Sequence, residues 1–164
     1  MKNITVFLTF IILGFPGCYS FKSTSIDAAI NTFYVPLMEN RVDNGPATLA
    51  ITFTEKLKDK VRSQSRLRFQ DTDPDLSFIG TVEAFNVTSQ APTSDNISAL
   101  SRLTISIKID FENRYDETKN WSQSFSYFQD FDGRTNLLDV QENLINTISN
   151  QIAEDIFNRA FGDW

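Results

Sequence analysis

The sequence lacks histidine entirely and carries a single cysteine, Cys18, among its 164 residues. Without histidine there is no usual proton shuttle, and the commonest zinc ligand is missing. A lone thiol cannot form an internal disulfide. No Gly-x-Ser-x-Gly or Ser-x-x-Lys pattern provides the setting of a serine nucleophile. These absences argue against an enzyme and predict a protein that works by binding.

Glycine and proline are also scarce, with six and five residues, so the chain is not of low complexity. Hydrophobic residues make up 41% of the sequence and aromatic residues 13%, which is ample for a packed core. The length is that of one domain. We therefore expect one globular domain behind whatever segment begins the chain.

The first residues are typical of an export signal. Lys2 is followed by an uncharged run from Ile4 to Phe15. This run is too short to cross a bilayer, which takes about 20 apolar residues, but it matches the core of a secretory signal peptide. Residues 1–17 are therefore predicted to be a cleaved signal peptide.

Cys18 follows this run directly, after Phe15, Pro16 and Gly17. A lone cysteine at this place is typical of a bacterial lipoprotein, in which the thiol is acylated and becomes the first mature residue. Each buried methylene of a lipid contributes about 0.8 kcal/mol, so several acyl chains hold a protein in a membrane almost permanently. We expect a lipid-anchored segment at 18–28 and a folded domain at 29–164. The alternative is cleavage after Ser20, which would leave a soluble secreted protein.

Removal of the signal takes one base, Lys2, and no acid, so 14 Lys and Arg remain against 21 Asp and Glu, a net charge of −7. Such an acidic protein is a poor nucleic-acid binder. The remaining bases are concentrated in one stretch, made up of Lys56, Lys58, Lys60, Arg62, Arg66 and Arg68. These side chains are candidates for contact with lipid phosphates or a partner. The alternative is a solvated helix face on which Glu55 and Asp59 pair with Lys58, Lys60 or Arg62.

Two segments have the periodicity of amphipathic helices. The first runs from Ala47 to about Gln64, after Pro46, and its apolar stripe contains Leu49, Ala50, Phe53, Leu57 and Val61. The second closes the chain. We expect it to begin at an N-cap Asp139 with Glu142 completing a capping box, and its stripe contains Val140, Leu144, Ile148, Ile152 and Ile156.

The segments between these helices have the pattern of strands. Short extended pieces are expected at 31–35 and 66–70, and a longer strand at 76–88 whose inward set, ending in Val87, slips phase near Ala84 and indicates a bulge. Residues 102–112 alternate strictly between polar and apolar and lead by a hairpin to a strand at 121–131. We predict an α+β fold with a mostly antiparallel sheet of about four strands and two α-helices packed on one face.

Two groups of acidic residues could suggest a metal site or acid–base chemistry. Asp71, Asp73 and Asp75 alternate like the start of a calcium loop, but Leu76 stands where that loop requires glycine, so a turn is predicted. Asp130 and Asp132 lie at a strand end, and Asp132 begins an Asp-Gly turn dipeptide. We therefore expect no metal and no cofactor other than the covalent lipid on Cys18.

The sequence resembles the LptE-type lipopolysaccharide-assembly lipoproteins, in their Bacteroidetes form, over nearly all of the mature chain. The resemblance is carried by residues 18–21 (Cys-Tyr-Ser-Phe), 99–105, 130–133 (Asp-Phe-Asp-Gly), 154–158 and Trp164. It implies an outer-membrane protein that sits in the lumen of the β-barrel LptD, as its plug and partner, and that contacts lipopolysaccharide. The alternative is another outer-membrane lipoprotein that activates a cell-wall synthase or serves an export machine.

Overall fold

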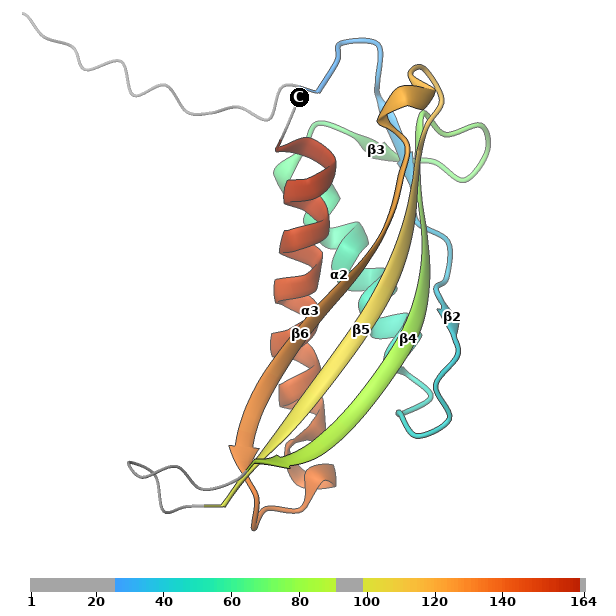
Figure 1. The fold of residues 1–164 in the computed structure, drawn as a ribbon. Helices are drawn as coiled ribbons and strands as arrows, with labels where there is room; N and C mark the ends of the chain where they lie inside the picture. Colours follow the sequence, from blue (N-terminus) through green and yellow to red (C-terminus); the bar gives the residue numbers. More distant parts are fainter. Residues whose placement is uncertain (1–25, 91–98, 163–164) are drawn as a thin grey trace, which may run out of the picture.

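The computed structural model describes residues 26–90 and 99–162 (Figure 1). The long elements are the strands β4 (Leu76–Gln90), β5 (Leu100–Asn113) and β6 (Trp121–Asp132) and the helices α2 (Leu49–Gln64) and α3 (Leu137–Phe161). Short elements complete the fold, namely β1 (Thr32–Tyr34), β2 (Glu39–Asn40), β3 (Arg68–Phe69) and the 3-10 turn η1 (Glu117–Lys119).

The domain has two layers, as Figure 1 shows: a long curved sheet, and the two helices packed side by side against one of its faces. The buried apolar side chains of both helices and of the inward strand positions form one core cluster. The expected α+β class and the placement of both helices on one face are thus confirmed. Within the described residues, neither helix is long and apolar enough to span a membrane.

The sheet itself differs from the expectation of about four mostly antiparallel strands. It is a mixed sheet of six strands in the order β3-β1-β4-β5-β6, with β2 also pairing with β4. The three long strands are antiparallel, whereas β1 pairs with both β3 and β4 in parallel and β2 pairs with β4 in parallel. The parallel pair of β1 and β3 arises because α2 lies between them and returns the chain in its original direction.

The phase slip in β4 is a β-bulge, as the sequence predicted. The register with β5 shifts between Val82 and Ala84, so both Val82 and Phe85 can face the core. The inward pattern does not extend to Val87, which is 44% exposed.

The start of α3 also differs from the prediction. The N-cap is Asn136, whose side-chain oxygen accepts the backbone N–H of Leu138 at 3.0 Å. Asp139 lies inside the first turn, and the expected capping box with Glu142 does not form. The apolar stripe is as predicted from Leu144 onward, while Val140 is only partly buried.

Candidate functional site

The bases of α2 do not form one patch, because consecutive helical residues point in different directions. Lys58 pairs with Glu55 at 2.9 Å, and its Nζ lies 5.2 Å from the centre of the Phe69 ring on β3. Lys60 projects to the other side of α2 and pairs with Glu154 of α3. The helix thus directs these two side chains to opposite flanks.

The ion pairs along α2 are those of a solvated helix, with one exception. Glu55 with Lys58 and Asp59 with Arg62, at 3.6 Å, are both pairs at i,i+3 spacing. The exception is Lys60, which spans the gap between the two helices to reach Glu154; its side chain is 16% exposed, close to the 19% of Lys58. Burial lowers the pKa of Lys60 despite its carboxylate partner.

Arg66 holds the start of the described chain in place. Its guanidinium donates to the carbonyl of Asp27 at 2.6 Å and to the side-chain oxygen of Asn31 at 3.1 Å. These bonds join the end of α2 to the segment that leads into β1. Arg66 therefore has a structural role at this end of the domain.

Two bases of the stretch differ from the other four in their surroundings. Within the described residues, neither Lys56 nor Arg68 has an ion pair with a carboxylate. Lys56 lies one turn before Lys60 on the flank toward α3, whereas Arg68 is exposed on the edge strand β3. The six bases therefore do not form one cluster, and Lys56 and Arg68 lie apart from each other.

The acidic residues singled out in the sequence are held by protein groups. The Asp75 carboxylate accepts the backbone N–H groups of Asn31 and Thr32 at 2.8 and 2.9 Å. Asp130 receives two bonds from the Arg102 guanidinium, at 2.7 and 2.9 Å, and Arg102 also lies 3.7 Å from the centre of the Phe128 ring. Asp132 pairs with Arg134 at 3.0 Å, and the hydrogen bonds from Arg134 lower its pKa to about 2.

The group of Arg102, Phe128 and Asp130 was not predicted from the sequence. The sequence showed only that Arg102 and Asp130 lie on two strands expected to form a hairpin. The register makes Arg102 and Asp130 direct neighbours across that hairpin. Among the described residues no cluster of three or more carboxylate or thiol side chains could hold a metal.

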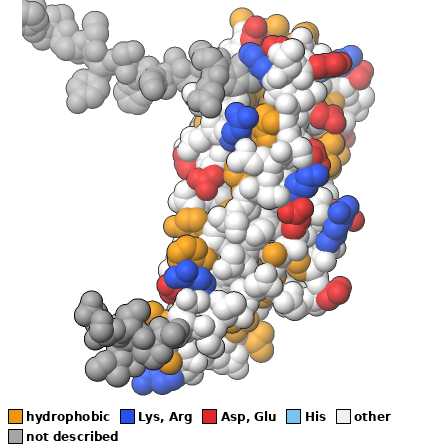
Figure 2. Space-filling model, viewed as in Figure 1, with side chains coloured by type: hydrophobic (Ala, Val, Ile, Leu, Met, Phe, Trp, Pro, Cys, Tyr) orange, Lys and Arg blue, Asp and Glu red, His pale blue; other side chains and the backbone are white. Residues whose placement is uncertain are grey.

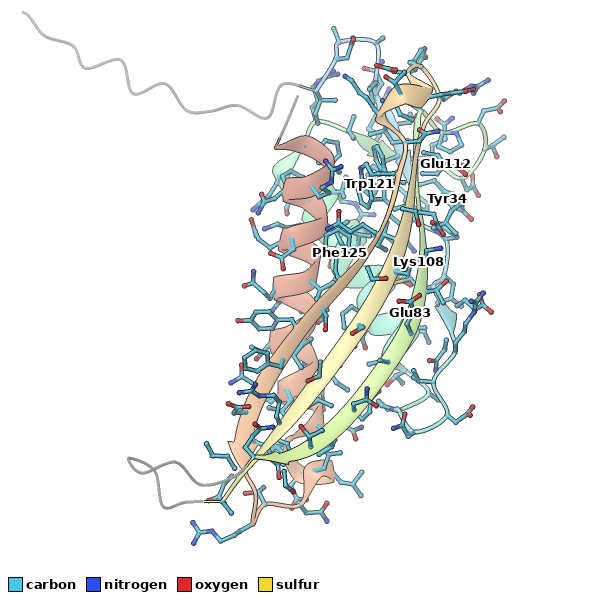
Figure 3. All side chains as sticks on the ribbon, viewed as in Figure 1. Tyr34, Glu83, Lys108, Glu112, Trp121 and Phe125 are labelled. Carbon is cyan, nitrogen blue, oxygen red and sulfur yellow. The ribbon has the colours of Figure 1, made fainter. Side chains whose placement is uncertain are left out.

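Among the described residues, no element covers the sheet face away from the helices, and this face is mostly hydrophilic, with Ile79 and Phe128 as its exposed apolar side chains. Hydroxyl groups dominate it, with Ser106 bonded to Ser126 and Ser124 donating to Glu83, both at 2.9 Å. Lys108 pairs with Asp110 on this face at 3.3 Å. Figure 3 shows Glu83 and Lys108 on this side, whereas Phe125 points toward the helices and is 7% exposed. The domain therefore presents a long polar surface to its surroundings.

Solved structures share this arrangement at low sequence identity. A minor lipoprotein from Acinetobacter baumannii matches with a TM-score of 0.53 and 10% identity over 80% of this chain and 94% of that one. The hypothetical protein CT253 from Chlamydia trachomatis gives 0.54 and 7% over 82% and 99%. Protein XCC0632 from Xanthomonas campestris gives 0.54 and 11% over 80% and 85%. No curated protein matches the sequence.

The fold is thus that of a small α+β domain with two helices on one face of a mixed sheet, a class that includes a bacterial lipoprotein. A family model narrows this class. The model for LptE, described as lipopolysaccharide-assembly, matches residues 30–160. The chain belongs to the LptE family, as the resemblance in its sequence indicated. Cys18 and Trp164 lie outside the described residues.

Proposed function

We propose that this protein is an outer-membrane lipoprotein, anchored by a lipid on Cys18, that plugs an LptD-type β-barrel and helps to assemble lipopolysaccharide in the outer leaflet. The observation that carries the proposal is the LptE family match over residues 30–160. The uncovered polar sheet face supports it, because a plug in a water-filled lumen needs hydrophilic outer surfaces.

The lipid anchor would make modest contacts sufficient. A tether keeps the protein and its barrel in one membrane and raises their effective concentration. Seven residues lie between Cys18 and Ile26, the first described residue, and the eight Cα–Cα steps that join the two span at most about 28 Å. This short reach favours a partner in the same membrane over a distant cell-wall synthase.

The test is affinity purification of the tagged full-length protein from detergent-solubilised outer membranes, with mass-spectrometric identification of the proteins recovered. Stoichiometric recovery of one large barrel of the LptD type is expected. A Cys18→Ser variant serves as the control for the anchor, since it should lose lipid labelling and recover less barrel. Recovery of a cell-wall synthase or an export component instead would replace the plug with the alternative role.

Among the candidate contacts we favour Lys56 and Arg68 for the phosphates of lipopolysaccharide, because the other four bases already bind protein groups. The double variant Lys56→Ala/Arg68→Ala should weaken binding of purified lipopolysaccharide by roughly tenfold, corresponding to about 1.4 kcal/mol. The control is Arg62→Ala. It removes one exposed positive charge of the same helix, and the sole ion pair that it breaks among the described residues is the one with Asp59. Equal losses in both variants would show that the effect is a general one of charge.

A further inference from the structure

In the part of the chain that the structure describes, the strand β6 forms one edge of the sheet and pairs only with β5. Half of the N–H and C=O groups of an edge strand point away from its neighbour. Within the described residues, the only backbone hydrogen bond of β6 outside the ladder with β5 joins the Asp132 carbonyl to the Thr135 N–H at 2.9 Å. The strand therefore presents an open backbone edge that is 12 residues long.

This edge lacks the devices that normally prevent edge-to-edge pairing, which are proline, lysine, bulges and short length. The opposite edge, β3, is two residues long and contains Arg68. In contrast, β6 has no proline, lysine or arginine, and its register with β5 is unbroken. From Trp121 to Gln129 it carries no charge. Nothing in β6 opposes the addition of another strand.

The order of side chains in β6 makes the strand complementary to itself. The side chains on its helix-facing side are Trp121, Gln123, Phe125, Tyr127, Gln129 and Phe131. When a second β6 lies antiparallel about Ser126, Trp121 comes opposite Phe131, Gln123 opposite Gln129, and Phe125 opposite Tyr127. Each aromatic side chain then meets an aromatic one and each amide meets an amide, and such cross-strand pairs stabilise a sheet.

The flank beside β6 also has apolar surface left to cover. Tyr127 and Phe131, with Leu137 and Val140 of α3, are only partly buried against the core. Leu138 is 75% exposed. Figure 2 shows hydrophobic side chains gathered along the flank formed by β6 and α3. A strand added at this edge would bury part of that surface.

We propose that a second copy of this chain pairs with the first through β6, antiparallel about Ser126, so that the two sheets continue into each other across a two-fold axis. The acidic net charge does not oppose the contact locally. Asp130 and Asp132 lie toward the end of the strand and are bound by Arg102 and Arg134. The pairing is a property of the chain when it is free of its barrel, and it does not rest on the proposed function.

Disulfide trapping of the purified full-length protein, separated from any barrel, tests the pairing. In a Ser126→Cys variant, the two introduced thiols lie on residues directly opposite each other, whose Cα atoms are about 4.5–5.5 Å apart in an antiparallel pair. This distance is within the range of a disulfide. Mild oxidation should convert most of the variant to a species of twice the monomer mass that disappears on reduction.

The matched control is Ser106→Cys, because Ser106 lies next to Ser126 on the same sheet face but on the interior strand β5. The Ser106→Cys variant should give no disulfide-linked dimer. The unaltered chain, oxidised in the same way, shows whether Cys18 itself forms any dimer. Adding Ser124→Lys to the Ser126→Cys variant should reduce the dimer at least fivefold, since lysine guards edge strands. Equal trapping of both cysteines, trapping of neither, or a disulfide to a protein of another mass would overturn the proposal.

Discussion

Asp75 connects two segments that are far apart in the sequence. Partial burial alone would raise the pKa of its carboxyl group, but hydrogen bonds from the Asn31 and Thr32 backbones and the Thr32 hydroxyl outweigh this and lower it. Asp75→Ala leaves the buried N–H of Thr32 without its acceptor, which costs about 1–3 kcal/mol. Urea unfolding at neutral pH should show this loss, whereas Asp71→Ala, on the exposed part of the same turn, should stay within about 0.5 kcal/mol.

The same carboxylate should make part of the stability depend on pH. Because folding lowers the pKa of Asp75, its contribution is present above the unfolded value of about 3.9 and is lost as the pH falls through the lower folded value. The difference in unfolding free energy between the unaltered protein and Asp75→Ala should therefore shrink in acid. A difference that stays constant down to about pH 2 would mean that the carboxylate is not the source.

Gly80 leaves a gap in β4 that Met38 fills. A Cβ atom at Gly80 would lie 2.6 Å from Cγ of Met38, whose side chain is 3% exposed. Gly80→Ala should therefore cost about 1–3 kcal/mol through overpacking, and Met38→Ala alone about 2–5 kcal/mol through the cavity it leaves. In urea unfolding, the double variant should lose less than the sum of the two by about 1 kcal/mol. Strict additivity would show that the two sites do not share this space.

At the scale of an element, two residues at the start of α3, Asn136 and Asp139, are candidates for its N-cap, and their substitutions should have different effects. Asn136 accepts the N–H of Leu138, so Asn136→Ala should cost about 1 kcal/mol. Asp139→Ala should cost less than about 0.5 kcal/mol, because this residue only faces the positive end of the helix dipole. Thermal or urea unfolding of the two variants gives the comparison. The reverse order would place the cap at Asp139, as the sequence pattern suggested.

The long elements were predictable because each carries its own periodic signal. The alternation of β5 and the stripes of α2 and α3 repeat often enough to define both type and buried face. The two-residue strands β2 and β3 are too short for such a signal, and only β3 was expected, within the extended piece at 66–70. They form because the core draws Met38 over Gly80 and because α2 returns the chain beside β1. Tertiary packing, rather than local pattern, determines these parallel pairs.

The basic stretch shows that closeness in the sequence does not predict closeness of side chains in the fold. Its six side chains lie within 13 residues, yet α2 turns Lys58 and Lys60 to opposite flanks and Arg66 folds back onto Asp27. The pairing of Glu55 with Lys58 and of Asp59 with Arg62 was foreseeable from helical spacing. The link from Lys60 to Glu154 was not, because it depends on how the two helices pack.

At the scale of the whole molecule, the sheet explains why one face of the domain is apolar and covered by helices while the other is mostly polar. Alternation along β5 places one set of side chains in the core under the helices and the other on the open face. No further layer is needed to bury the apolar residues, so the hydrophilic face remains available to a partner. Among the described residues, apolar surface remains at Ile79 and Phe128 on the open face and along the flank at β6, where an open backbone edge and partly buried aromatic side chains occur together.

The whole molecule should also have an unusually flat response to pH near neutrality. The chain has no histidine, the side chain whose ordinary pKa lies between about 5 and 8, so the urea midpoint should not change between about pH 6 and pH 8. It should fall in acid, since Asp75, Asp110, Asp130 and Asp132 all have lowered pKa values in the folded state. The contribution of each is complete above its unfolded pKa and is lost as the carboxylate becomes protonated. Urea titrations across this range, monitored by the fluorescence of the two tryptophans, Trp121 and Trp164, measure the midpoint. A step in the midpoint near pH 6.5 would reveal a titrating group that these carboxylates do not account for.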